Sequence, residues 1–329
     1  MGQYTFQRCY FSDLGALNEI YVKSFGGGGS VPYFQWKYLD NPAGKAIAYV
    51  AEADGKVAGF YGVIPEYWYI GGGKRILHQS MDTMTHPDHR GKGLFPKLAH
   101  MVFDRIREET GGLLVIGYPG PTSYAGFVHK LKWKSMVEMK YLFAYKWMFQ
   151  AAALFRGGQG AVVEDITTYP AEMDAFFAAH EAPVRPFTKY LDRGVLDWRL
   201  AAHPSTRYDR CVVRAEGRIV GHCAYRVDPD GRIFILLVDF LKRDLFDKYM
   251  RDVVAHLFKR PGTTAVHTFL ATFPEVEASY RALGFVSNPF NRGPFSYRTP
   301  LIVLADPPKQ GPDPYELSNW DVQPIMRDY

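Results

Sequence analysis

The feature that most constrains the fold of this chain is an internal repeat. Residues 36–42, WKYLDNP, have a counterpart in residues 198–204, WRLAAHP, which follows 162 residues later. Gly55 with Gly217, and Gly59 with Gly221, share the same offset. Each pair lies in a similar context, a strand-like segment, a glycine turn and a second strand-like segment. The Trp and the Pro of this segment and the two glycines are four matches at one offset, and they predict a duplicated unit.

A later match supports the duplication and helps to place its boundary. Residues 130–133 resemble residues 282–285 at an offset near 152, which a helix or loop of different length explains. The strand pattern is lost over residues 147–162. We therefore expect one domain over residues 1–150 and a second over 151–329, with a C-terminal tail over 306–329. The length of 329 residues fits two domains.

Strand-like and helix-like segments follow the same order in both halves. In the first half, strands are expected at 3–10, 46–53, 56–70, 74–86 and 113–118, with further strands up to 149. Helices are expected at 12–25, 94–109 and 122–131. Ser12 is the expected N-cap of the first of these helices. A second short helix is expected to carry Phe34, Trp36 and Leu39. In the second half, strands are expected at 162–168, 208–215, 218–227, 232–240 and 264–270, and helices at 170–180, 187–201, 243–258 and 274–283. The predicted class is α/β, with a twisted, mixed and mostly antiparallel sheet in each half flanked by helices.

Composition excludes several classes of function. The net charge is only +5 and no dense Lys/Arg run occurs, so no nucleic-acid partner is expected. Three cysteines without CxxC or His spacing predict neither disulfides nor a metal. The N-terminus lacks a signal-peptide pattern, and no apolar run approaches the ~20 residues of a membrane span. We expect a cytoplasmic protein, monomeric or homodimeric.

The most informative stretch is residues 80–95, SMDTMTHPDHRGKGLF, where a strand is followed by a turn and a helix. The N-terminus of a helix offers unpaired amides and a partial positive charge. Gly91 and Gly93 would allow a diphosphate to approach the backbone, and successive amides would form a concave anion site. Arg90 and Lys92 add positive charge at its rim.

This stretch resembles the pyrophosphate loop of the GNAT superfamily of N-acyltransferases, [RQ]-x-x-G-x-[GA] between a strand and a helix. Arg90 and Gly93 match the pattern, whereas Phe95 stands where the family has Gly or Ala. The resemblance implies that acyl-coenzyme A, for example acetyl-CoA, binds here as co-substrate. The residues expected to bind it are Met84, Thr85, His89, Arg90, Gly91, Lys92, Gly93, Leu94 and Phe95.

A second motif follows, GYPGPTSYAGF at residues 117–127. It resembles the segment in which GNAT enzymes lay the pantetheine arm between two diverging parallel strands, and this adds Ser123 to the expected cofactor contacts. The family's helix ends in Y-x-x-x-[GN]-[FW], but Val128 and Lys132 replace its Tyr and Gly here. The second half has that ending intact at 280–285, yet it lacks the phosphate loop. We therefore expect the first domain to bind the cofactor and the second to shape the acceptor cleft or to support the interface.

Acyl transfer to an amine needs a donor for the thioester oxygen, an acceptor for the amine proton and a proton for the thiolate. The resemblance implies that a kink in the strand frees the amide of Met84 or Thr85 for the thioester oxygen. Asp82 is the first candidate base, because Ser80, Asp82 and Met84 would share one strand face. Glu66 is the second candidate base. The candidate proton donors are Tyr124 and Tyr118, and the histidines His78, His86, His89 and His129 are further candidates.

The nature of the acceptor is the least constrained expectation. Tandem GNAT proteins with W-[KR]-x(4)-P helices look like those of bacterial polysaccharide biosynthesis, which implies a small-molecule amine such as an amino sugar or a nucleotide-linked amino sugar. Acylation of an aminoglycoside, a peptide amine or a polyamine is the first alternative. The second alternative is a non-catalytic acyl-CoA-binding module.

Overall fold

The computed structural model describes residues 4–153, 160–179, 185–270, 274–288, 299–307 and 311–327. In the first half the strands are β1 (Thr5–Arg8), β2 (Ile47–Ala53), β3 (Lys56–Ile70), β4 (Gly73–Thr85), β5 (Leu114–Gly117) and β6 (Lys134–Tyr145). The helices are α1 (Leu14–Phe25), α2 (Val31–Phe34), α3 (Leu94–Thr110), α4 (Pro121–Ala125) and α5 (Lys146–Ala153), with single helical turns η1 (Gln35–Leu39), η2 (Pro87–His89) and η3 (Gly126–Lys130).

The second half contains the strands β7 (Val162–Ile166), β8 (Phe187–Lys189), β9 (Asp209–Ala215), β10 (Arg218–Val227), β11 (Arg232–Phe240), β12 (Ala265–Leu270), β13 (Val286–Ser287) and β14 (Thr299–Ala305). Its helices are α6 (Glu172–Ala179), α7 (Arg193–Leu196), α8 (Arg243–Lys259) and α9 (Pro274–Ala282), with the turns η4 (Asp197–Ala201), η5 (Leu317–Asn319) and η6 (Pro324–Met326).

The mixed α/β class predicted from the sequence is confirmed, three local predictions are corrected and one strand was missed. The side chain of Asp13, not Ser12, caps α1 by accepting from the amide of Ala16. Residues 146–149 are helical, and residues 187–189 form a strand that pairs with β3. The strand β14 was not predicted at all.

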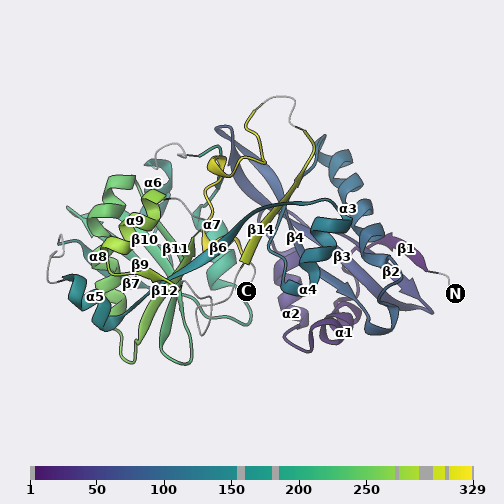
Figure 1. The fold of residues 1–329 in the computed structure, drawn as a ribbon, viewed down its shortest axis with the longest axis horizontal. Coiled ribbons are helices and arrows are strands. Elements are labelled where there is room, and N and C mark those ends of the chain that lie inside the picture. Colours follow the sequence, from purple (N-terminus) through teal and green to yellow (C-terminus); the bar gives the residue numbers. More distant parts are fainter. Residues whose placement is uncertain are drawn as a thin grey trace.

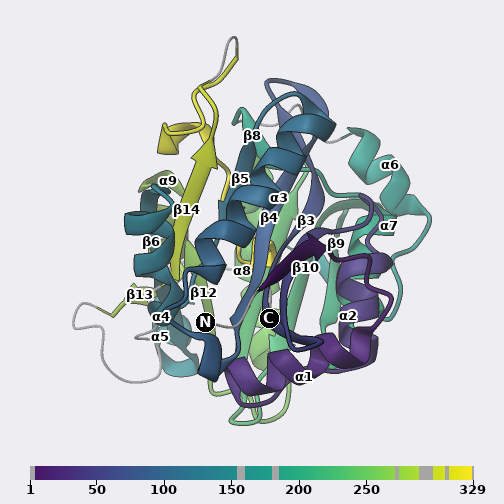
Figure 2. The ribbon, with the colours of Figure 1, turned by 90° about the vertical axis from the view of Figure 1, so that its right-hand side faces the viewer.

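The two halves form two lobes that share one sheet path (Figure 1). Among the described residues, the strand order is β1-β2-β3-β4-β5-β14-β6-β12-β11-β10-β9-β7, with β8 beside β3 and β13 beside β6. Helix α3 covers one face of the first lobe, and α1 and α2 pack against a separate core that includes Phe60 and Met84 (Figure 2). Helix α8 packs in the core of the second lobe.

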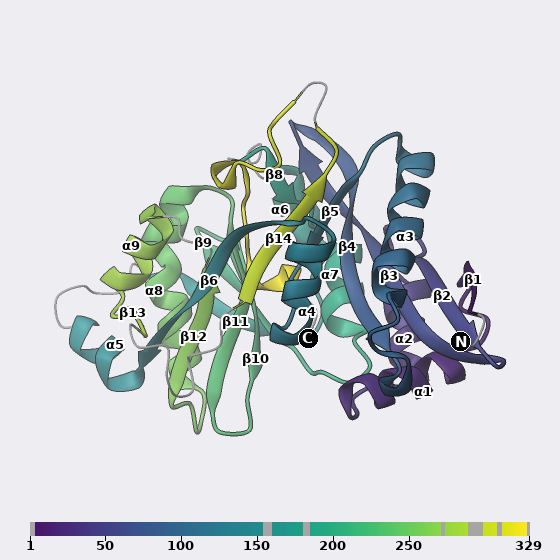
Figure 3. The ribbon, with the colours of Figure 1, turned by 45° about the vertical axis from the view of Figure 1, so that its right-hand side comes forward.

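Two strands cross between the lobes, as Figure 3 shows. The C-terminal strand β14 lies between β5 and β6 of the first half, with Ile302 opposite Gly117 and Leu301 opposite Val137. In return, β6 pairs with β12 of the second half, where Phe143 lies opposite His267. Each lobe is therefore completed by a strand from the other, and the predicted division at residue 150 stays a prediction.

The repeated tryptophans meet where the lobes face each other. The rings of Trp36 and Trp198 stack with centroids 5.1 Å apart at 21°. Each indole N–H donates to the backbone carbonyl of the other tryptophan, at 2.8 Å and 3.0 Å. Both residues lie in a turn of π-helix after a one-turn α-helix, capped by Ser30 in the first half and Asp192 in the second. The sequence repeat thus corresponds to a local structure that occurs twice and packs against itself.

The repeated pair Gly55 and Gly217 occurs where the backbone conformation favours glycine. Asp54 with Gly55, and Glu216 with Gly217, all have positive φ, between 51° and 76°. Two consecutive residues of this kind make the tight turn that best fits the twist of a β-hairpin. The hairpins β2–β3 and β9–β10 therefore close in the same way.

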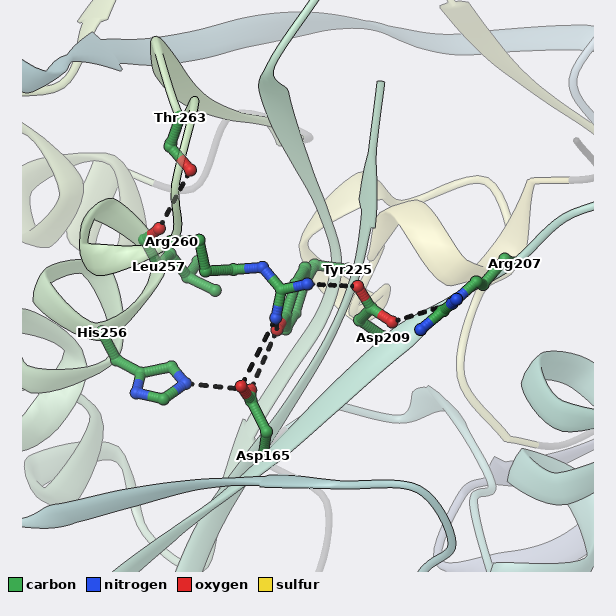
Figure 4. Close-up of polar contacts among 8 residues, drawn as sticks. All are labelled: Asp165, Arg207, Asp209, Tyr225, His256, Leu257, Arg260 and Thr263. Carbon is green, nitrogen blue, oxygen red and sulfur yellow. Dashed lines mark hydrogen bonds and ion pairs between the residues drawn. The ribbon is translucent and has the colours of Figure 1, made fainter. Parts of the chain in front are cut away.

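A polar cluster attaches α8 to the outer strands of the second lobe (Figure 4). The carboxylate of Asp165 accepts from His256 at 2.9 Å and from the hydroxyl of Tyr225 at 3.0 Å. Arg260 donates to Tyr225 and to Asp209, at 2.8 Å and 2.7 Å. Burial opposes ionisation of Asp165, but the contacts with His256, Tyr225 and Arg260 outweigh it and lower the pKa of this carboxyl.

This shift makes a prediction about acid stability. Because the pKa of Asp165 is lower in the folded than in the unfolded chain, its contribution is present at neutral pH and is lost as the pH falls through the folded-state pKa. We expect Asp165→Asn to lower the free energy of unfolding at pH 7 by less than about 1 kcal/mol, the range of exposed pairs. Urea unfolding at a series of pH values should show the difference shrinking toward pH 3. A difference that grows with acidity would contradict this role.

Within the described residues, none of the helices combines the length and the apolar character needed to cross a bilayer.

Candidate functional site

The strand β4 carries a bulge near its C-terminal end. Gly62 lies opposite Met81 and Phe60 opposite Met84, so the single residue Tyr61 faces two residues, Asp82 and Thr83. Asp82 has a φ of 26°, which is rare for a residue with a side chain. A bulge of this kind bends the strand and redirects its side chains.

The bulge corrects one expectation about β4. Ser80, Asp82 and Met84 do not share a face, because the extra residue interrupts the strand's alternation. Ser80 accepts a hydrogen bond from Tyr61 at 3.0 Å, whereas Asp82 contacts the turn η1 on the other side. Met84 is fully buried in the core below α1 and α2.

β4 and β5 diverge after Gln79, before β4 reaches its bulge. They pair in parallel at only two positions, His78 with Val115 and Gln79 with Ile116. The next residue of β5, Gly117, pairs with β14 on its other edge. A wedge therefore opens between β4 and β5 toward the C-terminal end of β4, as the resemblance to the GNAT superfamily implied.

The loop at the mouth of the wedge contains two glycines in the left-handed backbone region. After η2, Gly91 and Gly93 take φ values of 76° and 75°, and a Cβ on either would meet no atom within 4 Å. Glycine is therefore required by the backbone conformation, and the space beside it is open. Gly91, Lys92 and Gly93 are all exposed.

Helix α3 begins directly after this loop and its first amides are available. Gly93 is the N-cap and makes no side-chain cap. In the described part of the chain, the amides from Gly91 to Phe95 have no hydrogen-bond partner. Such a row of amides at the positive end of a helix of 17 residues is suited to an anion.

Phe95, the departure from the family motif, is directed away from this row. Its ring packs against Phe127, with centroids 5.0 Å apart, and against Tyr61, at 5.8 Å. A Cβ on Gly126 would lie only 2.9 Å from the ring, so the glycine makes room for it. The large side chain is thus accommodated in the core next to α3.

Asp82, the first candidate base, is held by two donors. The ammonium of Lys37 lies 2.8 Å from its Oδ2, and the hydroxyl of Tyr38 donates to the same oxygen at 2.5 Å. The side chain of Lys37 is 1% exposed and that of Asp82 11%. Lys37 also lies 4.2 Å from the centre of the Tyr33 ring. These contacts fasten the bulge to η1, so the arrangement favours a positioning role for Asp82.

Glu66, the second candidate base, lies away from the bulge. It is five residues along β3 from Tyr61, roughly 17 Å at the rise of a strand. Its carboxylate is 2.5 Å from the ammonium of Lys189 and accepts from the indole of Trp68 at 3.1 Å. Burial lowers the pKa of Lys189, and the attraction of Glu66 offsets this only in part. The pair joins β3 to β8.

The two candidate tyrosines pack on opposite faces of β5. Tyr124 lies in α4 and is half-buried in the core beneath α3. Tyr118 packs against the core shared with the second lobe, and its hydroxyl oxygen is buried. They do not converge on one point. Ser123, the expected cofactor contact, donates through its amide and hydroxyl to the carbonyl of Gly120 at 3.2 Å and 3.3 Å.

The candidate histidines also lie in different environments. Burial lowers the pKa of His78 to about 4 despite an opposing effect of Glu109, so its ring is neutral at pH 7. His86 accepts from the amide of Asp88, which shapes the turn η2. The Nδ1 of His89 lies 2.9 Å from the hydroxyl of Tyr4. His129 is exposed on η3.

A cavity of about 1300 Å³ lies on the outer side of the loop, between α1, β1 and the β2–β3 turn. It reaches the loop only through His86, Asp88 and His89 and does not include Asp82 or residues 91–95. Backbone geometry suited to a diphosphate is found at the first amides of α3 and not in the lining of this cavity.

The comparisons agree with this geometry. Residues 12–136 match the family model described as an acetyltransferase (GNAT) domain. No protein with a curated description matches the chain.

Solved structures resemble the chain over most of its length. A probable N-acyltransferase from Enterococcus faecalis V583 aligns with a TM-score of 0.70 at 11% identity, covering 92% of this chain and 72% of that one. A GCN5-related N-acetyltransferase from Anabaena variabilis aligns at 0.66 and 13% identity, over 92% and 72%. The N-myristoyltransferase of Saccharomyces cerevisiae, solved with bound myristoyl-CoA, aligns at 0.60 and 10% identity, over 97% and 83%. At these identities the likeness shows the fold.

Lys37 and Tyr38 were not singled out by the sequence. The repeat did contain a signal, because a basic residue follows the tryptophan in both halves, Lys37 in the first and Arg199 in the second. Both are buried, and Arg199 donates to backbone carbonyls of Ile325 and Arg327.

The ion pair predicts a large effect on stability. Lys37→Met would leave Asp82 as a nearly buried charge that has lost its cation, which costs about 3–5 kcal/mol. We expect Asp82→Asn in the same background to recover part of this loss. Urea unfolding of the two variants tests the pair, with Lys23→Met on the surface of α1 as the control. A loss below about 1 kcal/mol for Lys37→Met would show that the pair does not hold the bulge.

Proposed function

We propose that this protein transfers an acyl group from acyl-CoA to a primary amine of a small-molecule acceptor. The observation that carries the proposal is the row of amides from Gly91 to Phe95, which stands at the mouth of the wedge between β4 and β5. The diphosphate of the co-substrate binds these amides, with Arg90 and Lys92 at the rim. The pantetheine arm then lies along the wedge.

The pairing of β3 and β4 supports an assignment for the thioester oxygen. The amide of His86 donates to Ala58, and hydrogen-bonded pairs alternate along an antiparallel ladder. Met84 therefore bonds to Phe60, while the N–H and C=O of Thr85 are directed away from β3. The carbonyl of Thr85 accordingly accepts from Ser24 of α1. The amide of Thr85 is the group we assign to the oxyanion.

The reaction then needs few further groups. The neutral amine attacks the thioester carbon, the C–N bond forms, and the tetrahedral oxyanion accepts a hydrogen bond from Thr85. The C–S bond breaks, the amine proton passes to water, and the thiolate takes a proton. Tyr124 is the proposed donor of that proton, since the hydroxyl of Tyr118 is buried. Asp82 acts by holding the bulge that positions Thr85.

An amino sugar, free or nucleotide-linked, remains the first proposed acceptor. A cationic acceptor such as an aminoglycoside or polyamine is favoured by one observation. The cavity beside the loop is lined by more carboxylates than cations, namely Asp13, Glu19, Glu52, Asp54 and Asp88 against Arg8, Lys23 and Lys56. Such a lining attracts positive charge.

The activity is tested by thiol release from acetyl-CoA in the presence of single amines. The panel contains glucosamine, a nucleotide-linked amino sugar, an aminoglycoside, spermidine and a peptide with a free amine. We expect release that depends on one class of amine. Tight CoA binding without release by any amine would favour a non-catalytic module, and absence of CoA binding would overturn the assignment.

Two glycines at opposite ends of α3 give a matched test of the loop. Gly93 and Gly111 have φ values of 75° and 77°, and a Cβ added at either would have no atom within 4 Å. Alanine at either position should therefore cost a similar amount of stability, about 1 kcal/mol. Only Gly93→Ala should lower CoA affinity, by about tenfold or more, measured by calorimetry. Equal affinities for the two variants would show that the diphosphate binds elsewhere.

A further inference from the structure

The second lobe contains its own pair of diverging strands. The parallel strands β11 and β12 pair only over Arg232–Phe234 and then separate. At the point of separation, the hydroxyl of Thr268 donates to the carbonyl of Ile235 at 3.2 Å. This side-chain hydrogen bond takes the place of the next backbone hydrogen bond between β11 and β12. The geometry repeats that of β4 and β5 in the first lobe.

A cavity of about 310 Å³ lies in this second wedge. This volume is at the lower end of the range for small-molecule sites. Its floor is formed by the C-terminal segment that includes Val322 and Pro324, both buried. The walls are mainly apolar, with Ile235, Leu236, Val238, Phe240, Leu270 and Val276 among them.

The charged groups at the rim already have partners. Arg185 forms an ion pair with Glu275 at 2.7 Å. Arg243 donates to the carbonyl of Glu275 at 3.0 Å and contacts Asp247 at 3.2 Å. Three cations, Arg185, Lys242 and Arg243, are balanced by three carboxylates, Asp239, Glu275 and Asp321. This rim gives no preference for a charged ligand.

The entrance to α8 does not suit a diphosphate. Residues 241–243 contain no glycine and none has positive φ, in contrast to the loop before α3. Lys242, the N-cap, is extended, and Asp244 places a negative charge in the first turn. A second molecule of CoA is therefore disfavoured, although the apolar wedge is present.

We propose that this cavity is a separate binding site for an uncharged aliphatic chain, such as that of a medium-chain alcohol. Apolar walls and an internally neutralised rim favour a neutral chain over a fatty acid or an acyl-CoA. The site is independent of the acyl-transfer activity proposed for the first lobe.

1-Octanol is the probe for this site, and methyl NMR of the full chain is the first measurement. We expect titration to shift the methyl resonances of Val238, Leu270 and Val276 with a Kd of about 1 mM or tighter, while those of the exposed Val227 do not move. The shifts should persist in saturating acetyl-CoA. Loss of the shifts with acetyl-CoA would show that the cofactor competes for this cavity, and it would overturn the proposal of a separate site.

A cavity-filling variant gives the second measurement. Val276→Phe should weaken octanol binding at least about tenfold, whereas Val227→Phe on the surface of β10 should leave it unchanged. CoA affinity should be the same in both variants. Equal octanol binding by the two variants, or no shift of the wall methyls in the unsubstituted chain, would refute the site even if CoA binds as proposed.

Discussion

The backbone ladder that β14 makes with β5 and β6 is the contact on which both lobes depend. It pairs the backbone groups on the outer edge of β5 up to Gly117. β5 can therefore remain paired with β14 where it separates from β4. The wedge proposed to hold the pantetheine arm therefore exists because a strand from the far end of the chain supports it. Reciprocally, β6 covers the edge of β12. Neither lobe has to expose a long unpaired edge where the two meet.

The two copies of the repeated turn have different tasks. In the first half, Lys37 and Tyr38 reach the bulge of β4 and fix Asp82 in an unfavourable backbone conformation. In the second half, Arg199 occupies the equivalent place and donates instead to carbonyls near the C-terminus. A buried cation is thus used once to shape a strand and once to anchor a segment. The stacked pair of Trp36 and Trp198 keeps both turns in register with each other.

Local patterns predicted most of the elements and the loop at α3, because periodicity, glycine turns and helix starts are encoded within a few residues. The pairing of strands that lie far apart in the chain could not be predicted from such local patterns. Thr299–Ala305 is a short apolar segment, and nothing within it specifies β5 and β6 as neighbours. The bulge was expected only by analogy and its position was missed, so the expectation that Ser80 shares a face with Asp82 and Met84 was wrong. Its cation, Lys37, comes from a turn 45 residues earlier.

The position of β14 in the chain also determines when the sheet of the first lobe can be completed during synthesis. During synthesis the first lobe emerges early, but β14, which completes its sheet, begins at Thr299, long after β6 has ended at Tyr145. Until then β5 and β6 lack their shared neighbour, and such open edges are prone to misassociation. Closing so long a loop is entropically slow. Competence to hold a co-substrate in the first wedge would therefore be acquired only after β14 has been made.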